Sequence, residues 1–199
     1  MAGRAAGERT GAGNGPTRRI LFRTMGPADA PAVAALHATS WRENYHDVLS
    51  AAYLAGDVES ERAAAWRARL TGATDREFGI VAEIDEALVG FAYVINDSAG
   101  TEFGNLLDNL HVESKAQGRG LGREMLRRVA ETLDSKGWAP KLWLWVYASN
   151  AGARRFYERY GAEECGQTLL ESADGGRVLS CRYVWRNTIG LTVFDAPGS

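Results

Sequence analysis

Cysteine is scarce in this sequence, with only two among 199 residues, Cys165 and Cys181. Their spacing is typical of neither a zinc site nor a disulfide framework. The three histidines, His37, His46 and His111, include no pair at positions i and i+4, which also argues against a metal site. We therefore predict a protein without a bound metal, located by default in the cytoplasm.

Long hydrophobic runs are also missing. No apolar stretch reaches the roughly 18 residues of a transmembrane helix, and the N-terminus lacks the apolar core of a secretory signal. Charge is nearly balanced, with 23 basic and 25 acidic residues and a formal net charge of −2. This balance gives no indication of a nucleic-acid or membrane partner.

The composition that remains is ordinary for a globular protein, with 45% hydrophobic and 24% charged residues, and the length suffices for one domain. Residues 1–17 contain Met1 as their only large apolar residue, so we predict a disordered arm there. We predict one domain over residues 18–186. Residues 187–199 are interpreted as a C-terminal tail, whose short apolar patch could also cover a sheet edge.

Hydrophobic periodicity within the domain alternates between strand and helix patterns, which predicts an α/β fold. Strands are predicted at residues 18–24, 78–84, 88–95, 103–112, 141–147, 162–170 and 177–185, and helices from residue 30 and at residues 60–70, 121–136 and 151–160. The segments 103–112 and 141–147 are apolar on both faces, as central strands are. The helix between them predicts that these two strands are parallel.

A glycine-rich turn links the strand 103–112 to the helix that follows. Its sequence is Gln117-Gly118-Arg119-Gly120-Leu121-Gly122. The first turn of a helix leaves backbone N–H groups unpaired and carries partial positive charge, and glycine lets a ligand approach the backbone closely. The turn therefore predicts a site for an anion such as a pyrophosphate.

Two common nucleotide-binding patterns do not fit this turn. A P-loop ends in Gly-Lys-Ser/Thr, whereas Arg123 and Glu124 follow the last glycine here. A dinucleotide-binding turn has the pattern G-x-G-x-x-G, and the third glycine would fall at Arg123. The pattern R/Q-x-x-G-x-G/A fits at Gln117, Gly120 and Gly122, and it resembles the acetyl-CoA pyrophosphate loop of the GNAT N-acetyltransferases.

A second segment strengthens this resemblance. The stretch from Asn150 to Ala162, with Ala153, Phe156 and Tyr157 between them, is similar to N-x-x-A-x-x-F-Y-x-x-x-G-F in the same family, with Ala162 in place of the last phenylalanine. The likeness covers roughly residues 18–186. It is strongest over 103–162 and weak before residue 75.

The resemblance implies a GNAT fold, which is a mixed twisted sheet of about six or seven strands flanked by about four helices, with splayed central parallel strands. It implies acetyl-CoA as co-substrate and direct transfer of its acetyl group to a primary amine of a small molecule or peptide. A backbone N–H near Leu110 to Val112 would polarise the thioester. The cofactor-binding residues that it implies are Leu110, His111, Val112, Gln117, Gly118, Arg119, Gly120, Leu121, Gly122, Arg123, Asn150, Ala153 and Tyr157.

Two side chains are the catalytic candidates. Tyr157 corresponds to the family's general acid, although it could instead only pack and hydrogen-bond the CoA sulfur. Asp108 is the candidate general base, and strand alternation places it on the face of Leu106 and Leu110. Glu102 is a second carboxylate candidate. His111, expected on the opposite face from Asp108, is a further possibility.

Several alternatives stay open from the sequence. The chain could transfer a longer acyl group, or bind acyl-CoA as a sensor without turnover. Trp41 and Trp66 could fill the core or form a wall of the acceptor site. Trp143, Trp145 and Trp185 leave a homodimer face open, although core packing explains them equally well.

Overall fold

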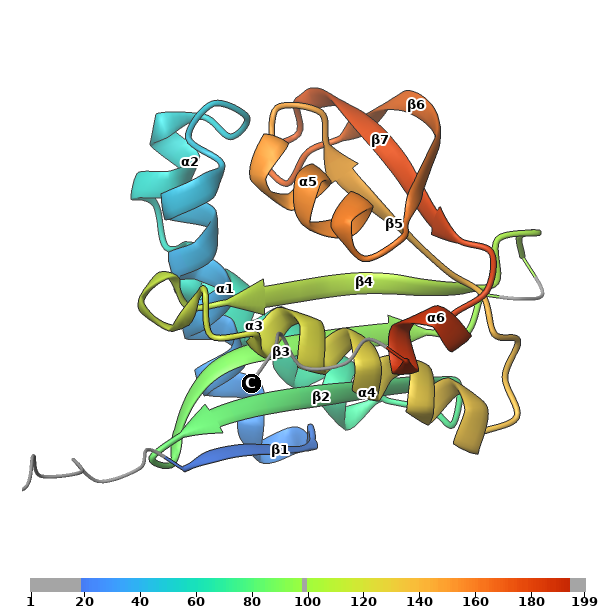
Figure 1. Cartoon of the computed structure of the whole chain (residues 1–199). Coiled ribbons are helices and arrows are strands. Elements are labelled where there is room, and N and C mark those ends of the chain that lie inside the picture. Colours follow the sequence, from blue (N-terminus) through green and yellow to red (C-terminus); the bar gives the residue numbers. More distant parts are fainter. Residues whose placement is uncertain (1–18, 98–99, 194–199) are drawn as a thin grey trace, which may run out of the picture.

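A computed structural model of the chain describes residues 19–97 and 100–193, so the expected arm at 1–17 lies outside the described residues. The described part is a mixed α/β fold around one seven-stranded sheet with the order β1-β2-β3-β4-β5-β7-β6 (Figure 1). The strands are β1 (Ile20–Thr24), β2 (Glu77–Ile84), β3 (Ala87–Ile95), β4 (Asn105–Val112), β5 (Leu142–Tyr147), β6 (Glu163–Glu171) and β7 (Arg177–Trp185). The α-helices are α1 (Ala30–Asn44), α2 (Ala51–Ala55), α3 (Val58–Thr71), α4 (Leu121–Ser135), α5 (Ala151–Arg159) and α6 (Ile189–Thr192), and short 3₁₀ turns lie at Pro27–Asp29 and Ser114–Ala116.

The first four strands form an antiparallel half of the sheet that is covered on both faces. Helices α1 and α3 pack on one face, where Trp66 meets Phe91 and Tyr93. Helix α4 packs on the other face through a buried stripe that contains Met125, Val129 and Leu133. This stripe follows the helical spacing that the sequence predicted, and burying it holds α4 against the sheet.

The central strands splay apart, as the resemblance implied. Strands β4 and β5 run parallel but pair only at Asn105 with Leu142 and at Leu106 with Trp143. Asn105 is fully buried where the strands meet, and its side-chain amide donates to the carbonyls of Ala139 and Lys141 at 2.8 Å. Beyond this point β5 continues with β7 and β6 as a second half of the sheet, next to α5 (Figure 1).

Strand β4 contains a bulge that corrects one expectation. Tyr93 on β3 lies opposite Asn109 and Val94 lies opposite Leu107, so Asp108 is the extra residue. The extra residue breaks the alternation of side chains. Asp108 therefore does not share a face with Leu110, which packs on the α4 side, but contacts Arg69 of α3.

The bulge also corrects the expectation that His111 lies on the opposite face from Asp108. His111 contacts Ser40 of α1, and α1 and α3 cover the same face of the sheet. Strand alternation from the sequence fails here because it assumes regular pairing along the whole strand.

The start of the expected tail belongs to the folded domain. Helix α6 packs against α4 at the lower right of Figure 1, and Leu191 is buried there in the main core. Trp185 is also in this core, and its indole N–H donates to the Tyr160 carbonyl at 2.8 Å. Trp143 is buried as well and Trp145 lines a cavity, so core packing accounts for these rings and a homodimer stays a prediction. None of the helices in the described ranges is long and apolar enough to cross a bilayer.

Candidate active site

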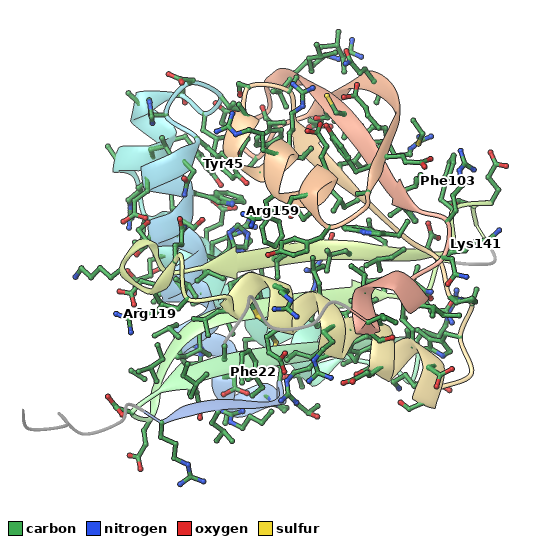
Figure 2. All side chains as sticks on the ribbon, in the orientation of Figure 1. Phe22, Tyr45, Phe103, Arg119, Lys141 and Arg159 are labelled. Atoms are coloured by element: carbon green, nitrogen blue, oxygen red, sulfur yellow. The ribbon has the colours of Figure 1, made fainter. Side chains whose placement is uncertain are left out.

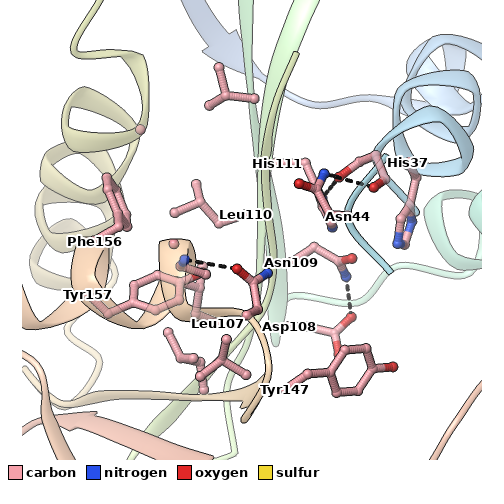
Figure 3. Close-up of a pocket in the computed structure, with 18 of the residues that line it drawn as sticks. His37, Asn44, Leu107, Asp108, Asn109, Leu110, His111, Tyr147, Phe156 and Tyr157 are labelled. Atoms are coloured by element: carbon pink, nitrogen blue, oxygen red, sulfur yellow. Dashed lines mark hydrogen bonds between the residues drawn. The ribbon is translucent and has the colours of Figure 1, made fainter. Parts of the chain in front are cut away.

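A cavity of about 1140 Å³ opens where β4 and β5 diverge. The cavity extends past β4, from the face of the sheet that α4 and α5 cover to the face that α1 and α3 cover. Figure 3 shows Leu110, Phe156 and Tyr157 on one side of β4, with His111 and α1 on the other. We call the first part the cofactor end and the second the acceptor end. The cavity exists because the splayed strands leave no cross-strand partner between them beyond Leu106.

The glycine turn forms the wall of the cofactor end. Gly118 and Gly120 have φ angles of 75° and 76°, in the left-handed region that glycine adopts at little cost. Gly120 is the N-cap of α4, so the unpaired N–H groups of the first turn lie at the cavity. Gly122 serves a different need, since a Cβ there would lie 3.0 Å from the Phe156 ring of α5.

The other polar residues of the turn lie at different places. Gln117 lines the cavity, and its side-chain amide donates to the Val112 carbonyl at 3.1 Å. Arg119 is exposed at the outer edge of the turn and does not line the cavity, unlike the other predicted cofactor-binding residues (Figure 2). Arg123 does line it. Arg127 and Arg128, further along α4, both pair with Glu124.

Helix α5 places Asn150 and Tyr157 at the same end. Asn150 caps the helix, because its side-chain oxygen accepts from the Ala153 N–H at 3.0 Å. Tyr157 is buried against Trp185 and Phe156, with 8% of its surface exposed, and this burial raises the pKa of its phenol. A phenol in such a site stays protonated at neutral pH and can donate a hydrogen bond into the cavity.

Aromatic side chains form the walls of the acceptor end. Trp41 and Trp66 are buried and also line the cavity, so they combine the two roles that the sequence left open. Tyr45, the residue after α1, and Tyr147 of β5 meet edge to face at 4.9 Å between ring centroids. Burial raises the pKa of Tyr45 to about 12. These rings line the acceptor end together with several polar side chains.

Asp108 and His111 also line the acceptor end, and each has hydrogen-bond partners within the protein. Asp108 Oδ2 accepts from Arg69 Nη1 at 2.6 Å and from Asn109 Nδ2 at 2.7 Å (Figure 3). His111 Nδ1 lies 2.8 Å from Ser40 Oγ, and burial lowers the pKa of its imidazole to about 4. Glu102, the other carboxylate candidate, is exposed before β4 and does not line the cavity.

Comparison with known proteins identifies the family. Residues 34–162 match the model of the Acetyltransferase (GNAT) family. The chain belongs to the GNAT family. Its sequence is 31% identical over 114 residues to the mycothiol acetyltransferase of Brachybacterium faecium, covering 57% of this chain and 32% of that protein. It is 35% identical over 92 residues to the [ribosomal protein bS18]-alanine N-acetyltransferase of Salmonella typhimurium, covering 45% of this chain and 57% of that protein.

These matches span less than two thirds of either curated relative. Among solved structures, the PaiA N-acetyltransferase of Thermoplasma acidophilum in complex with coenzyme A aligns with a TM-score of 0.61 at 15% identity, covering 81% of this chain and 98% of that chain. This likeness shows that the GNAT fold expected from the sequence is correct. No group of three or more potential metal-ligating side chains occurs in the described ranges.

The residues that sequence analysis missed in this GNAT domain lie mostly at the acceptor end. They are Ser40, Asn44, Arg62, Arg69 and Asn109. None belongs to a motif. The four on α1 and α3 reach the cavity only because these helices pack beside β4, and Asn109 lies on β4 itself. The aromatic content of residues 41–66 was the one signal in the sequence that pointed to this region.

Proposed function

We propose that the protein is an N-acetyltransferase that moves the acetyl group of acetyl-CoA to a primary amine within a ternary complex. The observation that carries this proposal is a single cavity that joins a glycine-built anion site to an aromatic pocket on the other side of β4. Such a passage lets a donor and an acceptor meet from opposite sides, which aligns them for direct attack. The names of the relatives and of the family support the reaction class.

The cofactor end fits the parts of acetyl-CoA in order. The turn from Gln117 to Gly122 would hold the pyrophosphate through the α4 N-terminus, with Arg123 near the 3′-phosphate. The pantetheine arm would follow the unpaired edge of β4 at Leu110 and Val112, between that strand and α5. The thioester would then lie between Tyr157 and the β4 bulge.

The chemistry at the thioester needs a proton at sulfur. The free amine attacks the thioester carbon, and a backbone N–H near the bulge stabilises the oxyanion. As the carbon–sulfur bond breaks, Tyr157 donates its proton to the sulfur and receives one from the attacking nitrogen, which becomes acidic once it is bonded to carbon. Because burial raises the pKa of Tyr157, this coupled transfer is favoured over formation of a free phenolate.

Asp108 is the second proposed catalytic residue, at the acceptor end. Its carboxylate lies in the floor of the cavity and is fixed by Arg69 and Asn109. We propose that this carboxylate orients the acceptor amine. Because both of these donors bind the same carboxylate oxygen, we propose this orienting role in place of general-base catalysis.

Calorimetric titration with acetyl-CoA, CoA, NAD and ATP separately tests the proposal. We expect micromolar binding of acetyl-CoA that falls at least 100-fold in Gly120→Glu. Gly137→Glu is the matched control, because Gly137 also has a positive φ, of 65°, and open space around it, yet lies at the far end of α4. Preference for NAD or ATP, or equal losses in the two variants, would contradict the assignment.

Two further outcomes separate the alternatives. Binding of acetyl-CoA without turnover of any amine in a broad screen would favour a sensor. Tighter binding and faster turnover of a longer acyl-CoA would favour a different acyl donor. Turnover of acetyl-CoA that is lost in Tyr157→Phe would support the acetyltransferase.

A further inference from the structure

The acceptor end contains few groups that could remove a proton from an incoming ammonium. Asp108 is the nearest carboxylate, and its Oδ2 already accepts two hydrogen bonds, from Arg69 at 2.6 Å and Asn109 at 2.7 Å. The side chains of Arg69 and Asp108 are 35% and 27% exposed, so the pair is partly shielded from water. The carboxylate oxygen that would take up a proton is thus already occupied by two donors.

Each of the two histidines has its Nδ1 already engaged in a hydrogen bond. Trp66 Nε1 donates to His37 Nδ1 at 3.0 Å, so neutral His37 carries its proton on Nε2. His111 Nδ1 lies 2.8 Å from Ser40 Oγ, so this ring nitrogen is occupied by the serine hydroxyl. Burial lowers the pKa of both imidazoles, which makes each a weak base.

The remaining titratable groups around His111 do not supply an evident base at the acceptor end. Helix α3 contributes the cations Arg62 and Arg69, which pair with Glu61 and Asp108, and α5 contributes Arg159 at the cavity wall. Tyr45 after α1 and Tyr147 on β5 are phenols whose pKa is raised by burial. The other cavity-lining carboxylate is Glu171, which is exposed at the end of β6. The acceptor end is thus rich in cations and N–H donors.

We propose that the acceptor is an amine of low basicity, an α-amino group that enters as the free amine, and that lysine ε-amines are poor substrates. This inference rests on the proposed function. Arginines and N–H donors disfavour a bound ammonium, and the rings of Trp41 and Trp66 border the same space, so the neutral form of the amine is favoured. The ammonium gives its proton to water before entry, and the steps at the thioester then need no further base.

The two classes of amine differ in the fraction that is neutral at pH 7. With pKa values of about 7.7–8.0 for an α-amine and about 10.4 for lysine, roughly one molecule in eight is neutral at pH 7 in the first case and about one in 2,500 in the second. The greater intrinsic nucleophilicity of the more basic amine offsets part of this difference. We expect the α-amine to be favoured in kcat/KM by on the order of 10²-fold at pH 7.

Two peptides test the inference. One has a free N-terminal alanine and no lysine. The other has the same sequence with a blocked N-terminus and one central lysine. We expect acetylation of the first at pH 7 and little of the second. For each probe, kcat/KM should rise tenfold per pH unit and level off near the pKa of that amine, so the profile for lysine should still be rising at pH 9. Replacing lysine by its γ-thia analogue, whose amine is less basic, should recover part of the rate.

The same experiments can overturn the inference. Equal rates for the two peptides at pH 7, or one common apparent pKa for both, would show that an enzyme group removes the proton. If kcat/KM no longer rose with pH in Glu171→Gln, the Glu171 carboxylate would be that group. Binding of acetyl-CoA with turnover of neither peptide also contradicts the inference while leaving the donor assignment intact. Absence of acetyl-CoA binding would instead refute the proposed function.

Discussion

The two ends of the cavity are built in different ways. The cofactor end is made mainly of backbone, from a turn with two left-handed glycines, a helix N-terminus and the unpaired edge of β4. The acceptor end is made of side chains that come from α1, α3, β4, β5 and the end of β6. A backbone site suits a ligand that stays the same, because phosphate and amide groups need only N–H donors and space. A side-chain site can be changed residue by residue, so acceptor choice can vary without loss of the donor.

The sharpest test of this comparison is Tyr157→Phe, because Tyr157 is the proposed general acid and lines the cavity where the two ends meet. We expect kcat to fall by about 10²–10³-fold, as for loss of a general acid. The affinity for acetyl-CoA should hardly change. Tyr53→Phe is the matched control, since its hydroxyl binds Glu61 outside the cavity. Rates measured at saturating acetyl-CoA give the answer, and equal loss in both variants would remove Tyr157 from the mechanism.

The acceptor end should also control how stability depends on pH. The folded state holds the pKa of His111 at about 4, below its ordinary value of 6.5, so the unfolded chain binds more protons between these values. Stability from the neutral ring is fully present above pH 6.5 and is lost as pH falls toward 4. We expect His111→Asn to remove roughly 2–3 kcal/mol of the decline in unfolding free energy between pH 7.5 and 4.5.

Urea denaturation at these two pH values measures the effect. The control is His46→Asn, because the His46 side chain is 67% exposed. An unchanged decline in His111→Asn would mean that the imidazole is not held neutral in the folded protein.

Asp108→Asn tests the acceptor end alone. We expect kcat/KM for the acceptor to fall about 30-fold while acetyl-CoA binding is unchanged, since a charge-assisted contact contributes about 1.5–3 kcal/mol. Glu102→Gln, a carboxylate outside the cavity, should have no such effect. Steady-state kinetics with the alanyl peptide would show this. A loss of acetyl-CoA affinity in Asp108→Asn would argue against separate ends.

Gly122→Ala tests the cofactor end through shape. The new Cβ would lie 3.0 Å from the Phe156 ring, so the ring and α5 must shift. We expect acetyl-CoA to bind about tenfold more weakly, from strain of about 1–3 kcal/mol. Gly152→Ala, whose Cβ would meet only the Asn150 oxygen at 3.7 Å, shows the effect of an alanine in open space on α5. Calorimetry on both variants compares them, and equal affinities would mean that the contact with Phe156 is not needed.

Gln117→Ala should have the smallest effect. It removes one side-chain hydrogen bond to the Val112 carbonyl, which contributes about 0.5–1.5 kcal/mol. A decrease of about three- to tenfold in acetyl-CoA affinity would follow, with kcat for bound substrates unchanged. A larger loss would mean that Gln117 contacts the cofactor directly.

The sequence by itself determined the cofactor end of this protein. Glycines with positive φ, an N-cap and an amphipathic helix are local features. The stretch from Gln117 to Leu133 therefore predicts both the turn and the helix that follows it. The strand before the turn and the segment from Asn150 to Tyr157 are equally local. They indicate the family and, with it, the fold.

Tertiary structure decided the acceptor end. The pairing of β3 with β4 places a bulge at Asp108, and this one residue moves the carboxylate to the face of α1 and α3, against the alternation in the sequence. Arg69 lies 39 positions before Asp108, and Ser40 lies 71 before His111, so no sequence pattern links them. Contacts of this kind depend on how helices pack on a sheet, which is a property of the whole chain and not of any short segment.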